Sequence, residues 1–150
     1  MNFMDTKTLL ENDLKSAMRA GEVVRKRALR MALSAIKLAE VQKGAALDEA
    51  QILAVLQKEI KSQQETIAEA EKANRPEMVA AAQAESAVLE NYLPPSLDPE
   101  ELETMVRAAI NEVGATSPAD MGKVMKALMP EIKGRASGEQ VSKMVRQLLQ

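Results

Sequence analysis

The sequence of 150 residues has no cysteine, histidine or tryptophan, and it has only one phenylalanine and one tyrosine. Without cysteine and histidine, the chain has no means for disulfides, thiolate chemistry, zinc-finger sites or imidazole acid–base catalysis. Any catalytic mechanism would have to use carboxylates, lysines, arginines or Tyr92. The shortage of aromatic side chains also argues against reading single-stranded bases by stacking. We therefore expect no metal site and no cofactor.

Long hydrophobic runs are also missing. No apolar stretch reaches the length of a membrane-spanning helix, and Asp5, Lys7 and Glu11 interrupt the first one, so the sequence predicts no signal peptide and a cytoplasmic location. Hydrophobic residues make up 46% and charged residues 28%, the proportions of a globular protein. Strong helix formers dominate, and no segment keeps the alternation of a strand. The sequence predicts an all-α protein.

Four helices are predicted in the N-terminal part, near residues 5–20, 23–42, 48–73 and 76–92. The third is long, and Asp48 with Gln51 has capping-box spacing at its start. In the first helix, Thr8 and Glu11 have the same spacing. Its expected buried stripe is Leu10, Leu14, Ala17 and Met18. The second helix has two adjacent apolar stripes, which predicts packing on more than one neighbour; they are Leu29, Ala32, Leu33, Ile36 and Ala28, Met31, Ala35, Leu38.

Pro94-Pro95 is the clearest boundary in the chain, because two consecutive prolines hold the backbone extended. We predict a helical N-terminal domain over residues 1–93, a proline-rich linker over 94–96, and a three-helix bundle over 97–150. Start signals for the three tail helices stand at Asp98, Ser117 and Ser137. Pro130 should end the middle one within a residue or two.

Charge is unevenly distributed although the net charge is only −2. Residues 19–30 carry a local balance of +4, residues 85–112 a balance of −6, and residues from 117 onward a balance of +3. Because partner choice follows the local field, the basic segments are candidate contacts for an anion.

The tail holds the first candidate site. Met121, Val124, Met125 and Leu128 give one apolar helix face, and Lys123 and Lys126 lie off that face. After Pro130, Lys133-Gly134-Arg135 places two cations around a glycine. A solvated linker is the commoner outcome for such a segment, and a cationic surface for an anionic backbone is the functional alternative. The residues alone leave both open.

The start of the second helix holds the other candidate patch, Arg25, Arg27 and Arg30. Cations near a helix N-terminus have the unfavourable sign for the helix dipole, at about 0.3 kcal/mol each or more. Their presence hints at an anionic partner, although a solvated charged face explains them equally well.

Other motifs are weak or missing. The sequence has neither of the glycine-rich nucleotide-binding patterns, G-x-x-x-x-G-K-[ST] and G-x-G-x-x-G. Five methionines of the last third could form an adaptable groove or, more often, fill a core; they are Met105, Met121, Met125, Met129 and Met144.

The chain also contains three motifs that are informative together, namely Tyr92-Leu93-Pro94, Asp120-Met121-Gly122-Lys123-Val124-Met125, and Lys133-Gly134-Arg135-Ala136 followed by Gly138. In combination they resemble the YqeY family, which includes the C-terminal domain of the GatB subunit of tRNA-dependent amidotransferases. Leu29-Arg30-Met31 and Leu56-Gln57-Lys58-Glu59 fit the N-terminal half of the family, so the resemblance covers nearly the whole chain.

The resemblance implies a helical region joined to a three-helix tail that helps to hold the tRNA body, while separate subunits do the amidation chemistry. Stand-alone members carry the label of carbon–nitrogen ligase with glutamine as amido donor. Because this sequence lacks glutaminase and kinase machinery, we expect an association with amidation and no catalysis by the chain itself.

We therefore predict a non-catalytic module that binds tRNA or other structured RNA through its backbone and shape. Amidotransferase subunits or an aminoacyl-tRNA synthetase are the implied protein partners. The alternative is a protein–protein adaptor, in which the methionine-rich tail face or the long third helix docks a partner helix.

Overall fold

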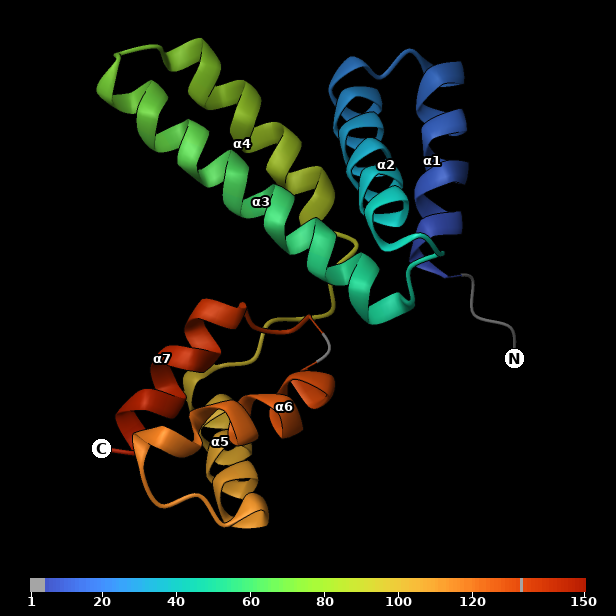
Figure 1. The fold of residues 1–150 in the computed structure, drawn as a ribbon. Helices are drawn as coiled ribbons and strands as arrows, with labels where there is room; N and C mark the ends of the chain where they lie inside the picture. Colours follow the sequence, from blue (N-terminus) through green and yellow to red (C-terminus); the bar gives the residue numbers. More distant parts are fainter. Residues whose placement is uncertain (1–4, 133) are drawn as a thin grey trace. The chain divides into compact units, whose positions relative to one another are not determined.

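The structure is a computed structural model that describes residues 5–132 and 134–150, and its regular elements are all helical (Figure 1). No strand occurs in these residues, so the expected all-α class is confirmed. The elements are α1 (Thr6–Ala20), α2 (Val23–Lys43), α3 (Glu49–Lys72), α4 (Pro76–Glu90), α5 (Pro99–Val113), the 3₁₀ turn η1 (Pro118–Asp120), α6 (Met121–Ile132) and α7 (Gly138–Leu148). The chain divides into two compact units, Met1–Leu93 and Pro94–Gln150, here called unit 1 and unit 2.

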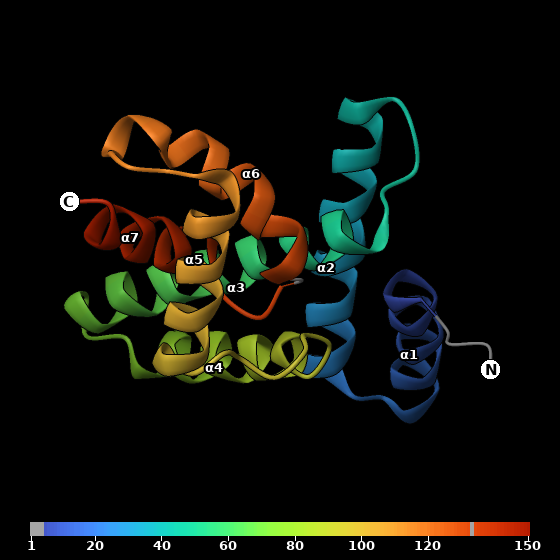
Figure 2. The ribbon, with the colours of Figure 1, turned by 90° about the horizontal axis from the view of Figure 1, so that it is seen from below.

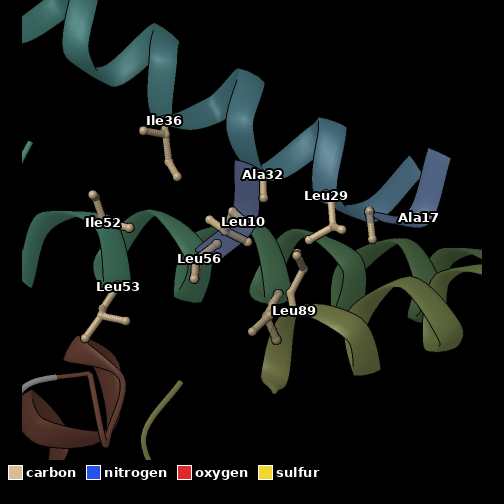
Figure 3. Close-up of a cluster of buried hydrophobic side chains, with 11 residues drawn as sticks. Leu10, Ala17, Leu29, Ala32, Ile36, Ile52, Leu53, Leu56 and Leu89 are labelled. Carbon is tan, nitrogen blue, oxygen red and sulfur yellow. The ribbon is translucent and has the colours of Figure 1, made fainter. Parts of the chain in front are cut away.

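Unit 1 consists of two antiparallel helical hairpins, α1–α2 and α3–α4 (Figures 1 and 2). Gly21 closes the first hairpin in the left-handed conformation, with φ of 69°, and its amide donates to the carbonyls of Ala17 and Met18. A glycine adopts this conformation without the penalty that a Cβ would bring. The core forms where the four helices meet, and its labelled side chains come from all of them (Figure 3).

The helix starts of unit 1 follow their capping residues. The predicted capping box of α3 is confirmed, because Asp48 Oδ1 accepts from the Gln51 amide at 2.8 Å and Gln51 Oε1 accepts from the Asp48 amide at 3.0 Å. The predicted box at Thr8 and Glu11 is wrong. Asp5 caps α1 instead, accepting from the Thr8 amide at 2.7 Å, and this bond places Thr8 inside the helix. The Asp5 carboxylate takes the capping position three residues before Thr8 and accepts from the Thr8 amide itself, so Thr8 cannot be the cap.

Two predicted buried stripes are only partly buried. Met18 is 51% exposed in α1, and Met31 and Leu38 are 36% and 60% exposed in α2. The two adjacent apolar stripes of α2 predicted packing on more than one neighbour, and this is confirmed because α2 packs on α1, α3 and α4. These neighbours cover Ala28, Leu29, Ala32 and Ile36 but leave the outer edge of the second stripe in solvent.

Unit 2 is built around a separate core contributed by α5, α6 and α7, in which Val106, Val124, Leu128, Val141 and Val145 are fully buried. Helix α6 ends at Ile132, two residues after Pro130, as predicted. Ser137 and Gln140 form the capping box of α7.

The start of the middle tail helix differs from the prediction. Residues Pro118–Asp120 form a 3₁₀ turn, and the Ser117 side chain makes no capping bond. Asp120 instead accepts from the Thr116 amide at 3.0 Å through Oδ2, which stabilises the turn before α6.

None of the helices within residues 5–132 and 134–150 is both long and apolar enough to cross a membrane.

Candidate nucleic-acid interface

Lys123 and Lys126 project from the face of α6 opposite to the buried Val124 and Leu128. Lys126 is exposed, and among the described residues it has no ion-pair partner. The Lys123 side chain is 74% exposed, with its Nζ 4.0 Å from Asp120 Oδ1. The pKa of the Asp120 carboxyl is lowered, first by the Thr116 amide and less by Lys123. Packing of the opposite face orients α6 so that both lysines point away from the core of unit 2.

Arg135 in the tail loop joins that loop to the segment before α5. Its Nε donates to the Pro95 carbonyl at 3.0 Å, and its Nη2 lies 3.4 Å from Glu101 Oε2. Its own carbonyl accepts from the Leu97 amide at 2.8 Å. Gly134 precedes it with φ of 76°, a conformation that favours glycine, whereas Lys133 lies outside the described residues. Arg135 is thus partly neutralised and has a structural role within unit 2.

The three predicted cations of α2 have different surroundings. Arg25 pairs with Glu22 at 3.2 Å and with Asp13 at 3.6 Å. Arg27 Nε lies 3.1 Å from Glu85 Oε1, although the Arg27 side chain is 70% exposed. Arg30 is exposed, and its Nη2 lies 4.0 Å from Met18 Sδ. Internal carboxylates therefore account for two of these arginines and leave Arg30 available to a ligand.

Glu85, which forms the ion pair with Arg27, belongs to a polar cluster inside unit 1 that the sequence analysis did not predict. Glu85 is buried on α4, and its Oε2 accepts from Gln63 Nε2 of α3 at 3.0 Å. Each residue occupies a buried position of its own helix. Gln63 continues the buried face of α3 that contains Leu56 and Ile60, and Glu85 shares a face of α4 with Ala82 and Leu89. Two polar residues at core positions of consecutive helices are the signal that could have predicted this pair.

Tyr92 follows α4 and closes a second polar cluster, with Asp13 of α1 and Arg25 of α2. Its hydroxyl donates to Asp13 Oδ2. Burial, and then the hydrogen bond to the Asp13 carboxylate, raise the pKa of Tyr92 from its ordinary value of 10.0 to about 12. The protonated hydroxyl is favoured because ionisation would bring a second negative charge next to Asp13.

This cluster gives a testable pH dependence. Because the folded pKa of Tyr92 lies above its unfolded value, its contribution to stability is complete below pH 10 and is lost as the pH rises through about 12. Tyr92 is the only tyrosine and the chain has no tryptophan, so tyrosinate absorbance reports this one group. We expect a midpoint near 12, which Asp13→Asn should lower toward the ordinary value. A midpoint at the ordinary value in the unmodified protein would contradict the hydrogen bond.

The five methionines of the last third are partly buried and pack against the core of unit 2. This arrangement favours the interpretation of these residues as core filler over an open groove.

No group of three or more carboxylates that could hold a metal ion occurs among residues 5–132 and 134–150.

The fold and the site together define an all-helical protein that presents cations on exposed helix faces. A family model described as "Yqey-like protein" matches residues 7–149, and the chain belongs to the YqeY family. Two curated proteins named "Altered inheritance of mitochondria protein 41, mitochondrial" are similar to it. The one from Pyrenophora tritici-repentis is 32% identical over 146 residues, covering 93% of this chain and 78% of the relative.

The second relative, from Lachancea thermotolerans, is 31% identical over 121 residues, which cover 79% of this chain and 65% of that protein. The chain thus spans somewhat less than two thirds of the length of this relative. Both names place the relatives in mitochondria, and the cytoplasmic location of this chain stays a prediction.

Proposed function

We propose that this protein is a non-catalytic module that binds structured RNA, tRNA first of all, next to glutamine-dependent amidation machinery. The observation that supports this function best is the exposed pair Lys123 and Lys126, fixed on α6 by the buried face behind it. Arg30 on α2 adds a further exposed cation. Amidotransferase subunits or an aminoacyl-tRNA synthetase are the protein partners that this role implies.

The proposed mode of binding is contact with the phosphate backbone. Fixed cations on a helix face attract phosphates and release counterions, so affinity should fall steeply with salt. A helical surface with few aromatic side chains suits a folded RNA, which proteins recognise by shape and backbone. The polar groups of Arg135 position the neighbouring tail loop, so its substitution should act through structure as well as charge.

A filter-binding titration with bulk tRNA across salt concentration tests this function. The double variant Lys123→Glu, Lys126→Glu should weaken binding about tenfold or more, and it should lower the salt slope by about one for each phosphate that the protein no longer binds. Both side chains are exposed, so circular dichroism should show an unchanged fold. Lys72→Glu, an exposed cation at the end of α3, is a control that alters charge without touching the proposed surface.

The outcome that contradicts the proposal is a salt-independent affinity, or an equal reduction of affinity in the control and in the double variant. Recovery of a stable protein partner after nuclease treatment, with no tRNA binding at all, would favour the adaptor function instead. Release of ammonia from glutamine by the purified chain would contradict the non-catalytic assignment.

A further inference from the structure

The exposed large hydrophobic residues of this protein are concentrated on one helix. Of the eight that the described residues contain, five lie on α2, namely Val23, Val24, Met31, Leu38 and Val41. Single exposed apolar residues are ordinary, whereas exposed apolar residues that adjoin one another mark an interaction surface. The core of unit 1 does not use these side chains, because α2 is already fixed by its buried residues Ala28, Leu29, Ala32 and Ile36.

The spacing of these residues indicates what could cover them. Val24, Met31 and Leu38 recur at intervals of seven residues, so they form a nearly straight apolar seam along the outer side of α2. The seam spans about 21 Å at 1.5 Å per residue. Ala35 lies beside it and leaves room for close approach. A seam with this repeat is complementary to another helix running along it.

The charges beside the seam indicate the chemistry of that helix. Arg30 and Lys37 each directly precede a seam residue, and both are exposed. The only acidic residue of α2 is Glu40, and its carboxylate is already used by Lys7 Nζ at 2.9 Å and by the Leu47 amide at 3.1 Å. Flanking positions of this kind select partner charge in paired helices, so two cations select carboxylates.

We infer that the outer face of α2 docks an amphipathic partner helix whose apolar stripe meets Val24, Met31 and Leu38 and whose acidic residues meet Arg30 and Lys37. The docked helix needs about three heptads to cover the seam. This inference does not depend on RNA binding, since the cations of α6 take no part in it. Arg30 is the one residue that both surfaces would share.

Two synthetic helical peptides test the surface. One has leucine along a heptad seam and glutamate at the flanking positions, and the other has lysine in place of every glutamate. Each carries a fluorescent label, and its anisotropy is measured with the full-length protein. We expect the glutamate peptide to bind and the lysine peptide to bind at least about tenfold more weakly. Leu38→Asp and Met31→Asp should each reduce binding of the glutamate peptide about tenfold or more.

The matched control is Met78→Asp, because Met78 on α4 is a similarly exposed methionine, at 43%, away from the seam. It should leave peptide binding unchanged. The charge reversal Arg30→Glu, Lys37→Glu should exchange the preference of the two peptides, a result that a merely unfolded variant would not produce. Equal binding of both peptides, no binding of either, or an equal loss in the control overturns the inference.

Two further outcomes assign the surface to another occupant and also overturn it. If sedimentation shows a dimer that Met31→Asp dissociates, the partner that covers the seam is a second copy of this chain. If the charge reversal reduces tRNA binding but not peptide binding, the cations of α2 serve RNA. If the α6 variant loses tRNA binding but keeps peptide binding, while Met31→Asp and Leu38→Asp lose peptide binding but keep tRNA binding, the two surfaces are supported independently.

Discussion

Glu85→Ala should destabilise unit 1 by about 3 kcal/mol, because it removes the acceptor of a buried hydrogen bond and leaves Gln63 without a partner. The loss of the ion pair to Arg27 contributes less, since that side chain is 70% exposed. Urea unfolding followed by circular dichroism measures the change. Glu85→Gln keeps a hydrogen-bonding group of the same size and should cost only about 1 kcal/mol.

A double variant separates the polar pair from simple cavity formation. Replacing both Gln63 and Glu85 by leucine removes donor and acceptor together, so it should be much less destabilising than Glu85→Ala alone. Arg27→Ala should have a small effect, within about 1 kcal/mol. If Glu85→Ala changes the free energy of unfolding by less than about 0.5 kcal/mol, the buried pair does not contribute as described.

Leu128→Ala should destabilise unit 2 by about 3 kcal/mol, because it empties the centre of a small core in which Leu128 is fully buried. A domain of this size has little stability to spare, so the variant should populate an unfolded unit 2. Each core consists of residues from one unit only, and we therefore expect unit 1 to stay folded. Hydrogen exchange measured peptide by peptide should show reduced protection in α5–α7 alone.

Leu10→Ala is the matched control, since Leu10 is the same residue type, is equally buried and belongs to the core of unit 1. It should lower protection in α1–α4 and spare α5–α7. If either variant lowers protection throughout the chain to the same extent, the two units unfold together and their separate cores do not make them independent. A result of that kind would also weaken the predicted role of Pro94-Pro95 as a linker.

Local signals in the sequence predicted the helices well where one residue type decides the outcome. Asp48 with Gln51 and Ser137 with Gln140 form the capping boxes that their spacing predicts, and Pro130 is followed by the end of α6. The prediction failed where two residues compete for the same role. Asp5 and Thr8 were both able to cap α1, and the carboxylate one turn earlier is the one that does so.

The candidate site was less predictable, because the surroundings of a cation depend on distant parts of the chain. Arg27 and Arg30 look alike in the sequence, yet Arg27 meets Glu85 of α4 and Arg30 does not. Arg135 similarly meets Glu101, 34 positions earlier. The polar positions Gln63 and Glu85 were visible as interruptions of apolar faces, but their pairing required the α3–α4 hairpin to bring them together.

The sequence by itself determined the all-helical class, the positions of the helices and the limits on chemistry, since helix propensity, capping and the absence of cysteine and histidine act within a few residues. Only the tertiary structure decided which cations are already neutralised and which apolar residues remain exposed. The physical reason is that charge pairing and burial depend on side chains from other helices, as the contrast between the buried Ile36 and the exposed Leu38 of α2 illustrates.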